Sequence, residues 1–307
     1  MTSSVQASPR SLAPAHGRAA FVRQRLLDHA ELTKPRIVAM VLVATLVGYY
    51  LGSAGRPRLA AMLHTLVGTA LAAAGTLTLN QVMEVDRDAR MERTRRRPLP
   101  DGRLAVAYAL AFGAALLATG LAWLALGTNL LSAFLTAMIA ITYLLVYTPL
   151  KPVTSLCSIV GAVPGALPPV VGWAAARGSL AAEPWVLFAI MFLWQIPHSL
   201  AIGRMYRDDF ARAGIRLLPV VDWDGTSTGL HVVSNCLALL PVGLLPTLMG
   251  FAGGAYFLVA LGLGLGFLWS AIGLWRRQSA TDARRLLFAS LVYLPVVLGV
   301  MALDKLP

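Results

Sequence analysis

The segment at residues 80–103, NQVMEVDRDARMERTRRRPLPDGR, separates two nearly uncharged runs at residues 59–79 and 104–126. It carries five acidic residues and seven arginines, although only 13% of the 307 residues are charged. A run of about 20 apolar residues is long enough to cross a bilayer as a helix. The two runs therefore predict membrane-spanning helices that are joined by a strongly charged loop.

The rest of the chain repeats this pattern of apolar runs and short charged connections. Hydrophobic residues make up 57% of the sequence, and the charged fraction is well below the roughly 25% of a soluble domain. Nine runs are long enough to span a bilayer: 36–53, 59–83, 104–126, 129–148, 153–176, 184–203, 228–249, 253–275 and 285–303. We expect an all-α fold, a polytopic membrane bundle of nine transmembrane helices.

The domain organisation follows from the same pattern. Residues 31–307 are expected to form a single transmembrane domain. Residues 1–30 are polar and basic, and they are expected to form a partly disordered tail with a short amphipathic helix near residues 20–31. An organelle transit peptide is the alternative for this tail, since it is rich in arginine and serine and has no acid before Asp28.

The basic residues predict the orientation of the bundle. Of the 26 lysines and arginines, 22 fall in the N-terminal tail or in the loops that lie on its side of the nine predicted spans. Cytoplasmic loops of membrane proteins carry this excess, so the N-terminus is expected to be cytoplasmic. The topology also accounts for most of the net charge of +12, with the lipid bilayer rather than nucleic acid as the partner.

The acidic residues in two of these loops need another explanation, because topology requires only the basic ones. Asn80, Glu84 and Asp88 are spaced i, i+4, i+8, which on a helix places them in one stripe at the end of a span. Asp208 and Asp209 follow the span at 184–203 at the same depth. Weak surface pairing with arginine is one interpretation. Two facing clusters are better explained by Mg²⁺, which prefers hard oxygen ligands and shares phosphate, with arginines holding the remaining oxygens of a diphosphate.

Four stretches resemble the UbiA-type intramembrane prenyltransferases, in the form found in the haem-modifying branch of that family. The first is NQVMEVDRDARMERTRRRPLP at 80–100, which matches the first aspartate-rich motif. The others are ELTKPRI at 31–37, YTPLKPVTSLCSIVGAVPGALPPVVGW at 147–173, and WQIPHSLAI with YRDDFARAGIRLLPVV within 194–221. The resemblance extends over residues 30–303. The chain departs from the general family pattern at Met205, where a second acid is expected, and at Glu84, where other branches have aspartate.

The resemblance implies a prenyltransferase that moves a farnesyl group from farnesyl diphosphate to a vinyl group of haem b, giving haem O. Magnesium would assist the departure of diphosphate, and the allylic carbocation would then be captured. A bacterial inner membrane, with the active-site loops on the cytoplasmic side, would be the location. A haem A synthase would be a possible downstream partner, which the sequence itself does not identify.

The site residues that the resemblance implies fall into three groups. Catalytic residues would be Asn80, Glu84, Asp88, Asp208 and Asp209. The metal ligands among them would be Asn80, Glu84, Asp88 and Asp209, with Asp86 as a neighbour. Diphosphate ligands would be Arg87, Arg93, Arg97, Lys151, Arg204 and Arg207, of which about half are expected only to pair with acids or set topology.

Polar and irregular residues inside the spans add further candidates. His198 is a candidate haem-binding residue, through the haem iron or a hydrogen bond, and a structural bond to a neighbouring helix is the alternative. Tyr143 and Tyr147 share a helical stripe and could shield a carbocation. The prolines and glycines of GAVPGALPPVVGW at 161–173 predict a broken span that borders the substrate chamber.

Three rival functions remain open. A prenyltransferase of this family could use another aromatic or tetrapyrrole acceptor. An ion-coupled transporter also has broken helices and membrane acids, although its acids are expected near the midplane rather than at one face. An oxidase assembly factor that binds haem without chemistry is the third.

Overall fold

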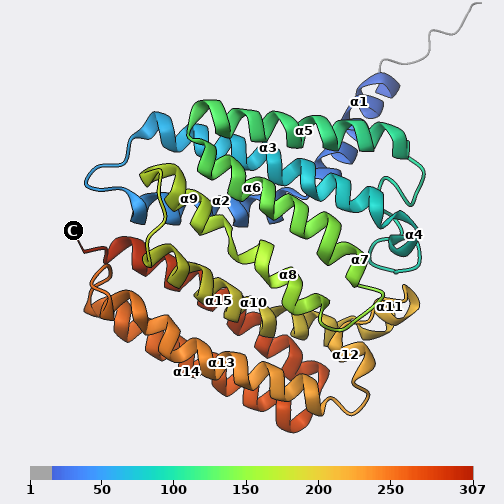
Figure 1. The fold of residues 1–307 in the computed structure, drawn as a ribbon. Coiled ribbons are helices and arrows are strands. Elements are labelled where there is room, and N and C mark those ends of the chain that lie inside the picture. The colour runs from blue at the N-terminus through green and yellow to red at the C-terminus, as the bar shows by residue number, and fades with distance from the viewer. Residues whose placement is uncertain (1–15, 307) are drawn as a thin grey trace, which may run out of the picture.

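The structure is a computed structural model, and it describes residues 16–306. These residues form a layered bundle of helices whose long members run roughly side by side (Figure 1). The helices that lie within or next to the bundle are α1 (His16–Thr33), α2 (Pro35–Gly52), α3 (Leu59–Met83), α4 (Val85–Asp88), α5 (Val106–Gly127), α6 (Leu130–Ile141), the π-helical segment η1 (Thr142–Tyr147), α7 (Thr148–Leu150), α8 (Cys157–Ala166), α9 (Pro168–Arg177), α10 (Glu183–Met205), α11 (Arg207–Arg212), α12 (Leu218–Val221), α13 (Thr226–Leu248), α14 (Gly254–Arg277) and α15 (Ala280–Leu303).

Within the described residues, nine helical stretches are long and apolar enough to cross a membrane. They are 35–52, 59–83, 106–127, 130–150, 157–177, 183–205, 226–248, 254–277 and 280–303. The predicted all-α fold and the nine predicted spans are confirmed, with ends that shift by only a few residues. The cytoplasmic placement of the N-terminus stays a prediction.

The tail prediction falls partly outside the described residues, which exclude residues 1–15. The chain is helical from His16, and α1 continues to Thr33, beyond the domain boundary expected at residue 30. Leu32 at its end is fully buried and belongs to a small core cluster with Leu99 and Leu104. The division into a tail and a transmembrane domain stays a prediction.

Two spans are irregular in ways that matter for the site. The span at 157–177 is divided at Leu167 into α8 and α9, and two prolines, Pro168 and Pro169, open α9. The span at 130–150 passes through the π-helical segment η1, which carries Tyr143 and Tyr147. Such π-helical turns are uncommon and occur often at functional sites.

The first helices of the bundle pack closely because glycines remove side chains at the crossings. A Cβ atom on Gly172 of α9 would overlap the carbonyl oxygen of Thr45 on α2, and one on Gly48 of α2 would overlap the carbonyl of Pro169. The hydrophobic effect does not drive helices together inside a bilayer, because lipid tails are as apolar as the side chains. Membrane helices therefore use small residues that let their backbones pack closely. The close α2–α9 contact fixes the broken span against the helix at the start of the domain.

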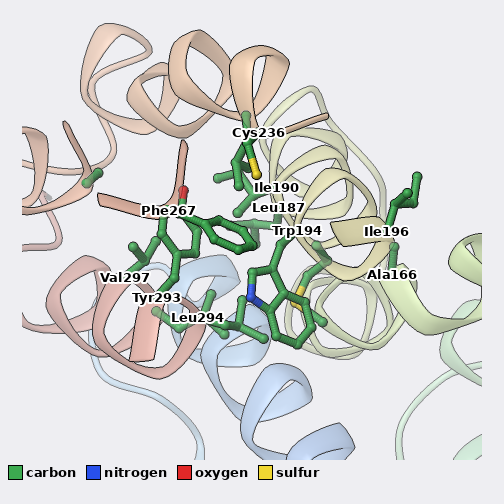
Figure 2. Close-up of a cluster of buried hydrophobic side chains, with 14 of the residues drawn as sticks. Ala166, Leu187, Ile190, Trp194, Ile196, Cys236, Phe267, Tyr293, Leu294 and Val297 are labelled. Carbon is green, nitrogen blue, oxygen red and sulfur yellow. The ribbon is translucent and has the colours of Figure 1, made fainter. Parts of the chain in front are cut away.

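The second half of the bundle encloses the largest apolar cluster (Figure 2). Helix α10 contributes Leu187, Ile190 and Trp194, which meet Cys236 of α13, Phe267 of α14, and Tyr293, Leu294 and Val297 of α15. The short helices α4, α7, α11 and α12 lie together at one end of the bundle (Figure 1). This end brings the two acidic motifs into one region.

Candidate active site

A cavity of about 470 Å³ opens at this end and extends between the helices. Seven sequence-predicted site residues line it: Asn80, Glu84, Asp88, Arg93, Arg97, Lys151 and His198. The remaining predicted residues are not in its lining: Arg87, Arg204, Arg207, Asp208 and Asp209. Asn80, Glu84 and Asp88 of the first acidic motif therefore line a concave site, whereas Asp208 and Asp209 of the second motif do not line it.

Asn80 and Glu84 form the inner polar wall of the cavity. Helix α3 ends at Met83, yet the Glu84 backbone N–H still donates to the Asn80 carbonyl at 3.1 Å, so the predicted stripe persists across the helix end. The Asn80 side-chain amide donates to Glu84 Oε2 and to Thr148 Oγ1, both at 3.0 Å. These two bonds use both amide hydrogens and leave Asn80 Oδ1 as an acceptor, 3.3 Å from Lys34 Nζ.

Each carboxylate in the wall has a basic partner. Lys151 Nζ lies 2.7 and 2.8 Å from the two oxygens of Glu84, and Arg97 Nη1 lies 2.6 Å from Asp88 Oδ2. The Glu84 and Asp88 side chains are only 10% and 4% exposed, which makes both pairs largely buried. Thr94 donates to the Asp88 carbonyl at 2.8 Å and fixes the turn.

Lys34 is a site residue that the sequence prediction missed. It precedes Pro35 in a left-handed conformation with φ 50°, which is uncommon for a residue other than glycine. Burial lowers the pKa of Lys34 to about 7, and the positive charges of Arg97 and Lys151 act in the same direction. The lysine beside the proline of ELTKPRI was the available signal, but it was counted only toward topology.

The second acidic motif contacts the first through two of its side chains, the Asp209 carboxylate and the Phe210 ring. Asp209 is buried and accepts hydrogen bonds from the Glu92 backbone N–H at 3.3 Å and from Arg212. Its neighbour Asp208 is exposed. The Arg93 guanidinium lies 4.8 Å from the ring centre of Phe210 in the same motif, and burial lowers the pKa of Arg93.

The other predicted polar residues lie outside the cavity lining. Arg204 donates to the Gln278 carbonyl at 2.9 Å, which ties α10 to the α14–α15 connection. Asp86 is exposed, and Arg87 and Arg207 are partly exposed. Their assignments as metal or diphosphate ligands, and those of Asp208 and Asp209, stay predictions.

The oxygen groups of the inner wall fit a magnesium ion that has additional ligands. Asn80, Glu84 and Asp88 offer an amide and two carboxylates in one wall. Within residues 16–306, no group of three His, Cys, Asp or Glu side chains is arranged to hold a metal by itself. Mg²⁺ usually keeps several waters and takes phosphate oxygens in addition to one or two carboxylates. The donor set therefore suits magnesium that arrives with a phosphate group.

The cavity continues into an apolar compartment of about 140 Å³. The two share Ile37, Tyr143 and Gly165, and the compartment is otherwise lined mainly by α3, α6 and the α8–α9 break. Residues of the broken span, among them Gly165, line both cavities, and the prediction that they border the substrate chamber stays a prediction. Tyr143 lines both cavities and Tyr147 lines the larger one, with their ring centres 5.2 Å apart. A polar, cationic cavity thus lies beside a compartment with an apolar lining.

Comparisons with known proteins agree with this arrangement. Residues 41–292 match the UbiA prenyltransferase family. A protoheme IX farnesyltransferase of Solibacter usitatus is 48% identical over 287 residues, which cover 91% of this chain and 98% of that protein. One of Koribacter versatilis is 42% identical, with 92% of this chain and 95% of that protein covered.

Solved structures share the fold at low sequence identity. A digeranylgeranylglyceryl phosphate synthase aligns with a TM-score of 0.74 at 16% identity, covering 92% of this chain and 98% of that one. A UbiA homologue of Archaeoglobus fulgidus, bound to GPP and Mg²⁺, aligns with a TM-score of 0.67 at 17% identity, covering 89% and 99%. Taken with the relatives and the family match, these likenesses show that the chain belongs to the UbiA prenyltransferase family.

Proposed function

We propose that this membrane enzyme transfers the farnesyl group of farnesyl diphosphate to a vinyl group of haem b and so produces haem O. The observation that carries the proposal is the cavity itself, in which a wall of oxygen ligands and four basic side chains adjoins an apolar compartment. Relatives with up to 48% identity over nearly the whole chain are protoheme IX farnesyltransferases, which supports haem as the acceptor.

The polar mouth binds the diphosphate. Lys34, Arg93, Arg97 and Lys151 line it, and their N–H groups are the donors for phosphate oxygens. Asn80, Glu84 and Asp88 would hold magnesium, which neutralises the diphosphate and makes it a better leaving group. Glu84 and Asp88 would hold the ion with the oxygens that now pair with Lys151 and Arg97, and the N–H groups of these two residues would then be available to the phosphates.

The apolar compartment receives the farnesyl chain and keeps water from it. As the bond between farnesyl C1 and the diphosphate oxygen breaks, the electron pair leaves with diphosphate and positive charge develops on the allylic carbons. Tyr143 and Tyr147 at the junction present aromatic rings that stabilise this charge. The terminal vinyl carbon then bonds to C1, and water captures the resulting cation beside the porphyrin ring with loss of a proton.

The second acidic motif acts, in this proposal, by holding the site closed. Asp209 joins the two loops through the Glu92 backbone N–H, and Phe210 forms part of the cavity lining. Direct ligation by Asp209 would require it to leave Glu92 and Arg212. The expected cytoplasmic opening of the cavity and the bacterial inner membrane remain part of the proposal, supported by the distribution of basic residues.

The decisive experiment incubates the purified full chain with haem b, farnesyl diphosphate and Mg²⁺ and measures haem O by mass spectrometry. Formation of haem O that depends on all three components supports the proposal. Prenylation of a hydroxybenzoate in place of haem would assign the chain to another acceptor. Transport of an ion by the protein in proteoliposomes, without any prenylated product, would favour the transporter alternative.

A further inference from the structure

His198 lies on α10 in the wall of the cavity, about four residues from the largest apolar cluster at Trp194. Its ring stacks on the indole of Trp194, with ring centres 5.0 Å apart and planes inclined by 24°. The Trp194 Nε1–H donates to the Ser290 carbonyl at 2.8 Å (Figure 2 shows the indole nitrogen of Trp194 directed toward α15). The imidazole therefore rests on a side chain that is itself fixed.

The hydrogen bonds of Ser290 determine which imidazole nitrogen carries the proton. Ser290 Oγ lies 2.6 Å from the Leu287 carbonyl and 2.8 Å from His198 Nδ1. A hydroxyl has one hydrogen, and a carbonyl oxygen can only accept, so Ser290 donates to Leu287. Its oxygen must then accept from Nδ1–H. The neutral imidazole consequently has its lone pair on Nε2.

This arrangement is the one that metal-binding histidines adopt. Such a histidine usually donates its other ring N–H to a fixed acceptor, which sets the tautomer and the ring direction and raises the basicity of the ligating nitrogen. Ser290 is fully buried, so water does not compete for the Nδ1–H bond. Among the described residues that line the cavity, His198 is the only imidazole, and the arginines there are cations with no lone pair to offer.

We propose that His198 Nε2 is the axial ligand of the iron of the haem acceptor, and that Ser290 is the positioning residue that fixes its tautomer. The inference rests on the proposed function, because it assumes a haem in this cavity. His198 stands six residues before Arg204, about 9 Å along the helix axis from the end of the span. Iron held at this depth keeps the porphyrin below the polar mouth, with its vinyl edge free to meet the farnesyl C1.

The test is haem binding by the intact protein in detergent, read by the Soret band and by the iron–histidine stretch in resonance Raman spectra. His198→Ala is expected to lose the histidine signature and to bind haem b at least about tenfold more weakly, and added imidazole is expected to restore the spectrum. Ser290→Ala is expected to keep haem bound but to lower the iron–histidine frequency and to weaken affinity by about 10- to 100-fold, the usual range for such partners. Ser290→Thr retains the hydroxyl and is expected to resemble the unmodified protein.

His64→Ala is the matched control, since His64 lies near Gly127 on the surface of the bundle and outside the cavity lining. If His198→Ala keeps the histidine spectrum, or Ser290→Ala leaves the frequency unchanged, the assignment is wrong. The His198→Ala enzyme could instead keep an unchanged haem spectrum and form a farnesylated haem that lacks the hydroxyl. That result would make His198 a proton acceptor in the addition of water, and it would also overturn axial ligation. Haem bound through His198 without formation of haem O would overturn the farnesyl transfer alone.

Discussion

Replacing Glu84 by glutamine separates the ion-pair role that the structure shows from the metal-ligand role that we propose. The carboxylate holds Lys151 in a buried ion pair, and it is a proposed magnesium ligand. Removing one member of a buried pair commonly destabilises a protein by about 3–5 kcal/mol, because the other charge stays buried. The Tyr147 ring, 4.6 Å from Lys151 Nζ, offsets part of this loss. We therefore expect a decrease of about 2–4 kcal/mol in the free energy of unfolding without magnesium.

The effect on turnover is expected to be larger and of another origin. Loss of one charged or polar group that stabilises developing charge commonly lowers kcat by about 10²–10³. The combined variant Glu84→Gln/Lys151→Met removes both charges, so it is expected to regain stability but not activity. This difference distinguishes the ion pair from the catalytic contribution.

The assay measures thermal unfolding and haem O formation across a magnesium titration, in detergent or nanodiscs. Magnesium together with diphosphate should stabilise the unmodified protein and Lys151→Met, but not Glu84→Gln. Glu92→Gln is the control, because Glu92 lies in the same loop with a side chain that is 61% exposed. Turnover by Glu84→Gln at the unmodified rate, with an unchanged magnesium response, would refute the proposed ligand role.

Three further changes test other parts of the site. Ala73→Phe places a large side chain in the apolar compartment. In competition assays it should shift the preference for the prenyl donor from farnesyl toward geranyl diphosphate by about tenfold or more. The control Val67→Phe, on the exposed side of α3, should leave this preference unchanged. Asp209→Asn keeps an acceptor for the Glu92 N–H, so the affinity of the protein for magnesium should stay within about threefold of the unmodified value. A decrease in magnesium affinity as large as that of Glu84→Gln would show that Asp209 is a metal ligand. Gly172→Val would force α2 and α9 apart, and overpacking of this kind destabilises a protein by about 1–3 kcal/mol or more. It should lower the yield of folded membrane protein, as measured by size-exclusion chromatography. A normal yield would show that the contact between the two helices can relax. In calorimetric titrations, magnesium and inorganic diphosphate should each bind at least about tenfold more tightly when the other is present. Independent binding of the two would contradict the exchange of partners that we propose for Glu84 and Asp88.

The fold was predictable because its signals are local. Each span is an apolar run whose length the bilayer dictates, and each connection is marked by charge, glycine or proline. The stripe from Asn80 to Asp88 was also readable, since the i, i+4 hydrogen bonds continue past the end of α3. The broken span was visible in its prolines, which cannot continue a regular helix.

The missed features depend on contacts between distant parts of the chain. Lys34 reaches Asn80 across 46 residues, and the proline that follows it is a local signal too weak to place it in the site. The hydrogen bond from the Glu92 backbone N–H to Asp209 joins two loops that are 117 residues apart, and no local pattern predicts it; the metal-ligand role of Asp209 stays a prediction. Ser290 is the one serine within α15, and its significance appears only when this apolar helix packs against His198.

The charges of the cavity explain why the site is stable before substrate arrives and still able to bind it. Four basic side chains and two carboxylates line the cavity, so an excess of positive charge remains after Glu84 and Asp88 are paired with Lys151 and Arg97. A buried charge without a partner destabilises a protein strongly. These two pairs prevent that cost before substrate arrives. A prenyl diphosphate alone would have to compete with the carboxylates for the same cations, and magnesium alone would have to displace those cations. If both arrived together, as proposed, the carboxylates and the cations would exchange their internal partners for the ion and the phosphates, and no buried charge would be left unpaired.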